Sequence, residues 1–129
     1  MTCDVEFLAE VNAALAGARF DWLGINLFEG WLELSHEPHR YRISWSGWLS
    51  EISSPTVGSD VHGYVFAAVI GPMIGMNLSE IQHRNGVYEL RFSNGQSVFA
   101  GHWSSGATDH VLMVESITDN APFTWGLLD

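Results

Sequence analysis

The sequence contains no lysine and a single cysteine, Cys3, in a chain of 129 residues. A lone thiol cannot form an internal disulfide, and acidic neighbours disfavour a reactive thiolate, so we expect Cys3 to be inert. The N-terminal segment, residues 1–11, lacks the basic flank and the apolar run of a secretory signal. The most apolar stretch, residues 61–76, is interrupted by Gly71 and Pro72 before it could span a bilayer. These absences predict a cytoplasmic protein without a membrane span.

Basic residues are also scarce. Fifteen acidic residues oppose five arginines, which gives a formal net charge of −10 at pH 7. A field of that sign repels nucleic acid and anionic lipid and attracts basic proteins, although charge can also serve solubility alone. No arginine follows Arg91, so the C-terminal third is a candidate acidic face. Its acids are Asp109, Glu115, Asp119 and Asp129.

The composition nevertheless predicts a folded chain of one domain, residues 1–129. Apolar residues make up 47% of the chain and charged residues only 16%, which is far from the profile of a disordered protein. Apolar positions at helical spacing, followed by Gly17, predict a helix over residues 4–16. A similar stripe that ends at Gly71-Pro72 predicts a second helix over residues 60–70.

Alternating apolar and polar residues predict strands between and after these helices. Residues 31–34 (WLEL) and 40–45 (RYRISW) alternate strictly, so each strand should have one buried face. Residues 110–117 (HVLMVESI) are apolar through most of their first half, which is typical of an inner strand covered on both faces.

Two Asn-Gly pairs, Asn85-Gly86 and Asn94-Gly95, bound an alternating segment. This arrangement predicts a three-stranded meander, because Asn-Gly favours the two-residue type I′ turn of a β-hairpin. The two turns fix the strand registers and give one apolar row on the core side. The expected cross-strand pairs are Ile81 with Leu90, Leu90 with Phe99, and Glu80 with Arg91.

An internal repeat is visible as well. LGINL at residues 23–27 matches IGMNL at residues 74–78, and each copy is followed by a strand that begins with glycine. Because each copy also follows a predicted helix, we interpret the chain as a duplicated unit. The sequence therefore predicts an α+β fold of antiparallel β-meanders with two helices. The α-β-β-β pseudo-repeats would cover about residues 4–53 and 60–117.

The sequence carries no recognisable catalytic or cofactor motif. HEPH sets His36 and His39 around Pro38, which forbids the helix of a zincin motif, and a third ligand such as His102 would have to arrive through the fold. Serine, aspartate and histidine gather within residues 104–110, a composition typical of a loop, without a nucleophile elbow. We therefore expect no enzyme and no bound metal or cofactor.

Surface recognition is the remaining class of function. Trp45 and Trp48 flank Ser46-Gly47 beside Glu51, and large aromatic residues near acids are typical anchors of protein-binding patches. The alternative is that both tryptophans belong to the core, where most of a tryptophan surface is usually buried. The candidate partner-binding residues are Trp45, Trp48, Glu51, Asp109 and Asp119.

The stretch from Ile74 to Trp103 resembles a pattern of small bacterial families of unknown function. The pattern is an Ile-Gly start, here Ile74-Gly75, then a strand, then a strand ending in Phe-x-Asn-Gly, here YELRFSNG through Gly95. Such families look like immunity proteins encoded beside polymorphic or contact-dependent toxins. The resemblance implies an acidic cytoplasmic protein that binds and neutralises a basic toxin domain. It transfers no catalytic residue.

Two other functions stay open on the sequence. One is a small-molecule-binding module, or an enzyme of unknown class, with a pocket between the two halves. The other is a structural homodimer that buries an aromatic patch against its own copy. Neither nucleic acid nor a membrane is expected as a partner.

Overall fold

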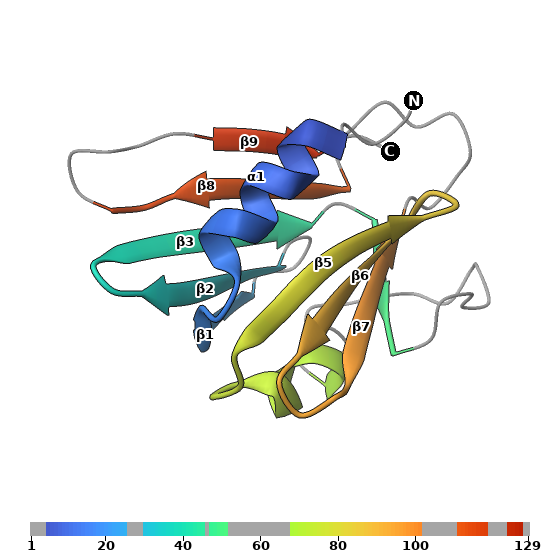
Figure 1. The fold of residues 1–129 in the computed structure, drawn as a ribbon. Coiled ribbons are helices and arrows are strands. Elements are labelled where there is room, and N and C mark those ends of the chain that lie inside the picture. Colours follow the sequence, from blue (N-terminus) through green and yellow to red (C-terminus); the bar gives the residue numbers. More distant parts are fainter. Residues whose placement is uncertain are drawn as a thin grey trace.

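The computed structural model describes residues 5–25, 30–45, 47–51, 68–101, 111–118 and 124–127 of the chain. Within these ranges the chain forms a helix at its N-terminal end, a 3-10 helix and nine antiparallel strands (Figure 1). The elements are α1 (Val5–Leu15), β1 (Arg19–Ile25), β2 (Gly30–His36), β3 (His39–Trp45), β4 (Trp48–Ser50), η1 (Gly71–Met73), β5 (Leu78–Arg84), β6 (Val87–Phe92), β7 (Ser97–Gly101), β8 (Leu112–Ser116) and β9 (Thr124–Leu127).

The strands form two sheets, which confirms the predicted α+β class with antiparallel meanders. Sheet A has the order β1-β2-β3-β8-β9, and sheet B has the order β4-β7-β6-β5. Each sheet contains three strands that are consecutive in the chain, β1-β2-β3 and β5-β6-β7. Figure 1 shows the strands of sheet B crossing those of sheet A steeply, with α1 packed against β5 and β9.

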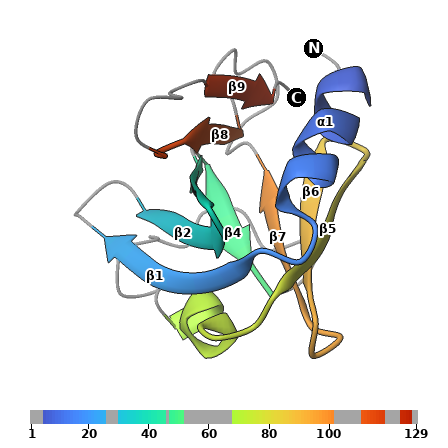
Figure 2. The ribbon, with the colours of Figure 1, turned by 60° about the vertical axis from the view of Figure 1, so that its left-hand side comes forward.

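The two sheets are joined at two corners, one by backbone hydrogen bonds and the other by the chain itself (Figure 2). At one corner, residues 17–20 pair with residues 75–78 in an antiparallel arrangement that we call the corner ladder; for example, the Leu78 N–H donates to the Ala18 carbonyl at 2.7 Å. At the other corner, the chain passes from β3 to β4 through Gly47. Its φ of 126° is a value that glycine adopts more readily than other residues. The two sheets therefore enclose one core between them.

The core follows the predicted alternation in β2 and β3. Leu32, Leu34 and Ile43 are at most 1% exposed, whereas Trp31 and Glu33, which alternate with Leu32 and Leu34 along β2, face outward. Burying a large apolar side chain stabilises the fold by roughly 1.5–3 kcal/mol. The largest fully buried side chains come from both sheets and from α1, and they include Tyr88, Phe20, Phe92, Leu15, Leu90 and Leu112.

Strand β8 differs from its prediction. It is an inner strand, between β3 and β9, but it is not covered on both faces. Leu112 and Val114 point into the core, while Met113 between them is 37% exposed on the outer face of sheet A. An apolar residue at a solvent-facing position hides the alternation in the sequence, so the prediction of a strand covered on both faces is wrong.

The first Asn-Gly turn is confirmed. Asn85-Gly86 has positive φ at both residues, 52° and 76°, as a type I′ turn requires. The resulting register pairs Ile81 with Leu90 and Glu80 with Arg91, as predicted.

The second Asn-Gly turn is one residue longer than predicted. In Asn94-Gly95 only the glycine has a positive φ, and its N–H donates to the Phe92 carbonyl at 3.0 Å. A three-residue loop results, in which a left-handed glycine closes a bulged turn. Leu90 therefore pairs with Val98, and the predicted partner Phe99 lies on the opposite face of β7.

Helix α1 matches the helix predicted over residues 4–16, and it closes the edge of β5. Val11 and Leu15 are its buried residues. The Asn12 side chain donates from Nδ2 to the Ile81 carbonyl at 2.8 Å and accepts through Oδ1 from the Ile81 N–H at 2.7 Å. One side-chain amide thus takes the place of a neighbouring strand at this position of β5.

Most of the second predicted helix, residues 60–70, lies outside the described residues. Residues 68–70 are helical and lead into η1. In the described part of the chain, no helix is long and apolar enough to cross a membrane.

The structure does not confirm the internal duplication. Each sheet has a meander of its own, but the matching pentapeptides occupy different places in them. Residues 23–25 form the end of β1, whereas residues 74–77 precede β5. The internal duplication therefore stays a prediction.

Candidate partner-binding surface

Trp45 and Trp48, the predicted aromatic anchors, are buried. Trp45 is 5% exposed, and its ring packs so closely on Gly30 that a Cβ there would lie 2.3 Å from the ring. Trp48 is 7% exposed and packs on Gly101 in the same way, with a Cβ distance of 2.5 Å. The two rings belong to different sheets, on either side of Gly47. They are therefore not the exposed anchors that the sequence suggests, because glycines on neighbouring strands leave room for both rings.

The predicted acidic residues have different environments. Glu51 follows β4 and is exposed, while Asp109 and Asp119 lie outside the described residues. Glu115 lies on the outer face of sheet A, with its Oε1 3.9 Å from Nη1 of Arg42. That neighbour offsets part of its charge, so Glu115 contributes less to an acidic face than the sequence suggests.

The outer face of sheet A carries a ladder of charges beside a well-packed tryptophan. Glu33 lies 3.5 Å from Arg40 and 3.9 Å from Arg42. The Trp31 indole covers Gly24, where a Cβ would lie 1.9 Å from the ring, and the Arg42 guanidinium is 5.5 Å from the ring centroid. Exposed ion pairs at these distances stabilise little, but the glycine and the cation together fix the orientation of Trp31.

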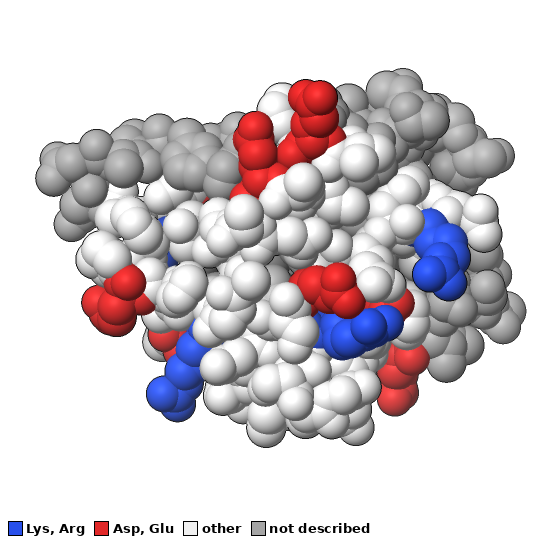
Figure 3. Space-filling model, viewed as in Figure 1, with Lys and Arg blue, Asp and Glu red and all other residues white. Residues whose placement is uncertain are grey.

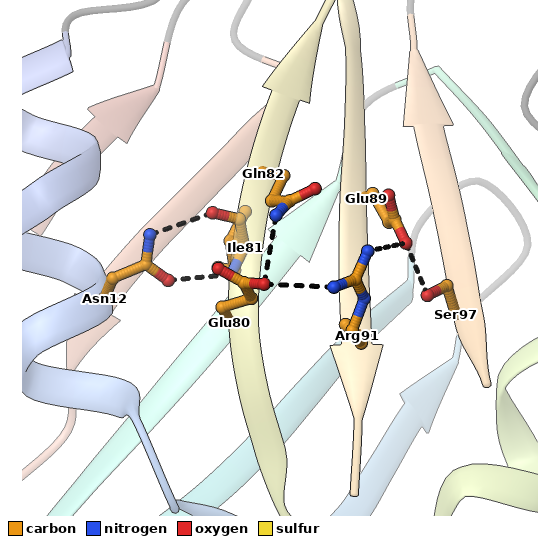
Figure 4. A network of polar contacts seen from close by, with 7 residues as sticks. All are labelled: Asn12, Glu80, Ile81, Gln82, Glu89, Arg91 and Ser97. Carbon is orange, nitrogen blue, oxygen red and sulfur yellow. Dashed lines mark hydrogen bonds and ion pairs between the residues drawn. The ribbon is translucent and has the colours of Figure 1, made fainter. Parts of the chain in front are cut away.

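The outer face of sheet B carries a tighter network (Figure 4). Arg91 donates to Oε1 of Glu80 and to Oε2 of Glu89, each at 3.2 Å. The Ser97 hydroxyl donates to the same Glu89 oxygen at 2.6 Å. The hydrogen bond from Ser97, followed by the contact with Arg91, lowers the pKa of Glu89 although burial opposes the shift.

Ion pairing distributes the charge of the chain unevenly. Arg40, Arg42 and Arg91, three of the five arginines, lie 3.2–3.9 Å from glutamates. Glu10 on α1 and Glu37 at the β2–β3 turn are exposed and form no ion pair with another described residue. Figure 3 shows acidic groups projecting over α1, and acid and base in contact over β5 and β6. Much of the positive charge is thus neutralised locally, and the outward field is acidic.

Trp22 on β1 is 58% exposed, more than any other tryptophan whose side chain the structure describes. Strict alternation from the buried Phe20 would turn it inward. A β-bulge between Phe20 and Trp22 inserts one residue into β1, so that Asp21 and Trp22 both face solvent. The sequence alone does not mark this position, because no residue type is diagnostic of such a bulge.

Exposed apolar side chains lie on β1 and just before β5. Among the side chains that the structure describes, six large apolar ones are exposed, and three of them are Trp22 at 58% and Ile25 at 37% on β1, and Ile74 at 48%. The pairing of β1 with β2 sets Trp22 opposite Glu33 and Ile25 opposite Gly30, so these two side chains point to opposite faces of sheet A. Beyond Phe20, the outer edge of β1 makes no backbone hydrogen bond to another described residue. We call residues 21–25 the β1 edge.

The two histidines of HEPH are cross-strand neighbours in a hairpin. His36 and His39 are paired across the two-residue turn of the β2–β3 hairpin, in which the Glu37–Pro38 peptide bond is cis. His36 Nδ1 lies 3.4 Å from the Ala14 carbonyl near the end of α1. In the described part of the chain, no three His, Cys, Asp or Glu side chains group as metal ligands. Residues 102–110, with the remaining predicted candidates, lie outside it.

Compared with known proteins, the chain matches no family model, no curated protein and no solved structure. Its own surface has a net acidic charge and, at β1, an apolar strand edge that forms no backbone hydrogen bond with another described residue.

Proposed function

We propose that this chain is a binding protein for a basic protein partner, in the specific form of an immunity or inhibitor protein that neutralises a basic toxin domain. The observation that carries the proposal is the charge arrangement. The chain has a net charge of −10, and three of its five arginines are offset by neighbouring glutamates. The resemblance of the stretch from Ile74 to Trp103 to immunity-like families supports the same conclusion.

Charge acts on the approach of the partner rather than on its retention. An acidic field accelerates encounter with a basic surface, and this acceleration weakens as salt screens the charges. Close packing of exposed apolar side chains then holds the complex, because buried anchors supply most of the affinity in protein interfaces. A nuclease binds its substrate through basic residues, so an acidic protein that covers them blocks the same surface.

The direct test is co-expression of the chain with the product of the gene next to its own. We expect a stable complex on purification and, if the neighbour is toxic, restored growth of the host. A toxic, basic neighbour that forms no complex and is not neutralised would overturn the proposal.

A second measurement tests the role of charge. The association rate of that complex should fall with added salt and with the triple variant Glu10→Gln, Glu37→Gln, Glu51→Gln, while the dissociation rate changes little. Ser79→Ala, at another exposed position, is the control that leaves the charge unchanged. An association rate that is indifferent to salt and to the triple variant would mean that charge does not select the partner.

A further inference from the structure

We infer that the β1 edge, residues 21–25, is the place where the basic partner binds, by adding an extended segment as a further strand of sheet A. This inference rests on the proposed function, and it names the surface and the mode of binding.

The backbone groups at the outer edges of β5 and β1 have different partners. On the β5 side, the corner ladder is continued by Asn12, which satisfies both backbone groups of Ile81. On the β1 side, the ladder stops at Phe20, where the bulge begins, and no described residue takes over the pairing. An edge strand with unpaired N–H and C=O groups is a template for another strand.

The β1 edge carries two exposed apolar side chains, Trp22 and Ile25, which point to opposite faces of the strand. In strand addition, backbone hydrogen bonds supply affinity, and side chains that alternate along the added strand supply specificity. Trp22 offers the aromatic anchor that such a site needs.

Charge distinguishes between the possible occupants of the β1 edge. A second copy of the chain would bring its own charge of −10 to the edge and would be repelled. Asp21 lies within the edge and is exposed, with its carboxylate accepting from the Ser35 hydroxyl at 2.5 Å. Arg19, the nearest base on β1, belongs to the part already paired with Asn77. An extended segment that carries basic side chains therefore fits this edge best.

The experiment is a titration of the isotope-labelled chain with a short peptide of alternating arginine and valine, followed by NMR. A peptide with glutamate in place of arginine is the matched probe for charge. We expect the arginine peptide to shift the amide signals of residues 22–25 and the Trp22 indole signal, and to slow amide exchange along the edge. Trp22→Lys should weaken this binding about tenfold, whereas Phe7→Lys, at an exposed aromatic residue of α1, should not.

Each other outcome separates the inference from the function on which it rests. Shifts confined to α1 or another surface, or no shift with either peptide, would overturn the β1 edge as the site and leave the proposed function to the co-expression test. Equal binding of both peptides at the edge would support the β1 edge as the binding site, but it would contradict the proposal that the partner is basic. Edge shifts that grow with the concentration of the chain alone would show that a second copy is the occupant.

Discussion

Strands β1 and β5 both extend from the corner ladder, yet the backbone groups at their outer edges differ in their partners. Past the ladder, β5 is closed by the side-chain amide of Asn12, which bonds both backbone groups of Ile81. β1 instead bulges after Phe20 and turns Trp22 outward. The difference teaches that one polar side chain on a packed helix can satisfy the outer backbone groups of a strand residue, and that a bulge can end strand pairing among the described residues.

The largest effect is expected from Asn12→Ala, which opens the closed edge. It leaves the partly buried N–H and C=O of Ile81 without partners, so we expect stability to fall by about 2 kcal/mol. Alanine is the better helix former, so the loss cannot come from weaker helix propensity. Urea denaturation measures the loss, and amide exchange should accelerate at Ile81.

Glu10→Ala, on an exposed turn of the same helix, is the control and should change stability by less than about 0.5 kcal/mol. If Asn12→Ala leaves the Ile81 amide protected, the amide of Asn12 is not what closes β5.

A smaller effect is expected from Gly24→Ala, which disturbs the packing of β1 against Trp31 of the neighbouring strand β2. The new Cβ would lie 1.9 Å from the Trp31 ring, so the ring must swing away from Gly24 and from Arg42. We expect a loss of about 1.5 kcal/mol by urea denaturation, since the ring is half-buried and can partly relax. In a Trp31→Ala background the same substitution should cost almost nothing, and an equal cost in both backgrounds would contradict the proposed clash.

The elements that were predicted from the sequence depend on local spacing. The period of α1 and the alternation in β2 and β3 are properties of neighbouring residues, and so is the type I′ turn at Asn85-Gly86. The same dipeptide at Asn94-Gly95 forms a different turn. There the Ser93 N–H donates to the Asn77 carbonyl at 2.8 Å, and the Ser93 hydroxyl accepts from the Asn77 N–H at 3.1 Å. Asn77, which is distant in sequence, thus contacts this turn, and the dipeptide alone does not predict that contact.

The candidate site was harder to predict for the same reason. Trp45 is buried because Gly30 on another strand leaves room for its ring, and Trp22 is exposed because β1 bulges at the end of the corner ladder. Both facts depend on strands that meet only in the folded chain. The net charge, which needs no fold, is the part of the functional hypothesis that the sequence supplies directly.

A pH-dependent effect is expected on the face of sheet B beside β5, where hydrogen bonds are shorter than the ion pairs of sheet A. Ser97→Ala removes the main cause of the lowered pKa of Glu89 and should cost about 1 kcal/mol near neutral pH. A carboxyl with a lowered pKa stabilises the fold above its unfolded pKa, and that contribution is lost as pH falls through its folded pKa. The stability difference between the two proteins should therefore shrink in acid, below about pH 4.

Urea midpoints at neutral and acidic pH measure this difference. Ser97→Thr keeps the hydroxyl and should behave as the natural chain does. A difference that stays constant with pH would show that Ser97 does not act through the carboxylate.

The smallest effect on stability is expected at the open edge itself, from Trp22→Ala. A side chain that is 58% exposed loses little packing on truncation, so stability should change by no more than about 0.5 kcal/mol. Affinity for the arginine-valine peptide should nevertheless fall about tenfold, because an exposed aromatic anchor acts only in the complex. Phe7→Ala controls for the loss of an exposed aromatic ring elsewhere. A stability loss above about 1.5 kcal/mol would mean that Trp22 packs against Ile74 and closes the β1 edge much as Asn12 closes β5, and the contrast between the two strands would disappear.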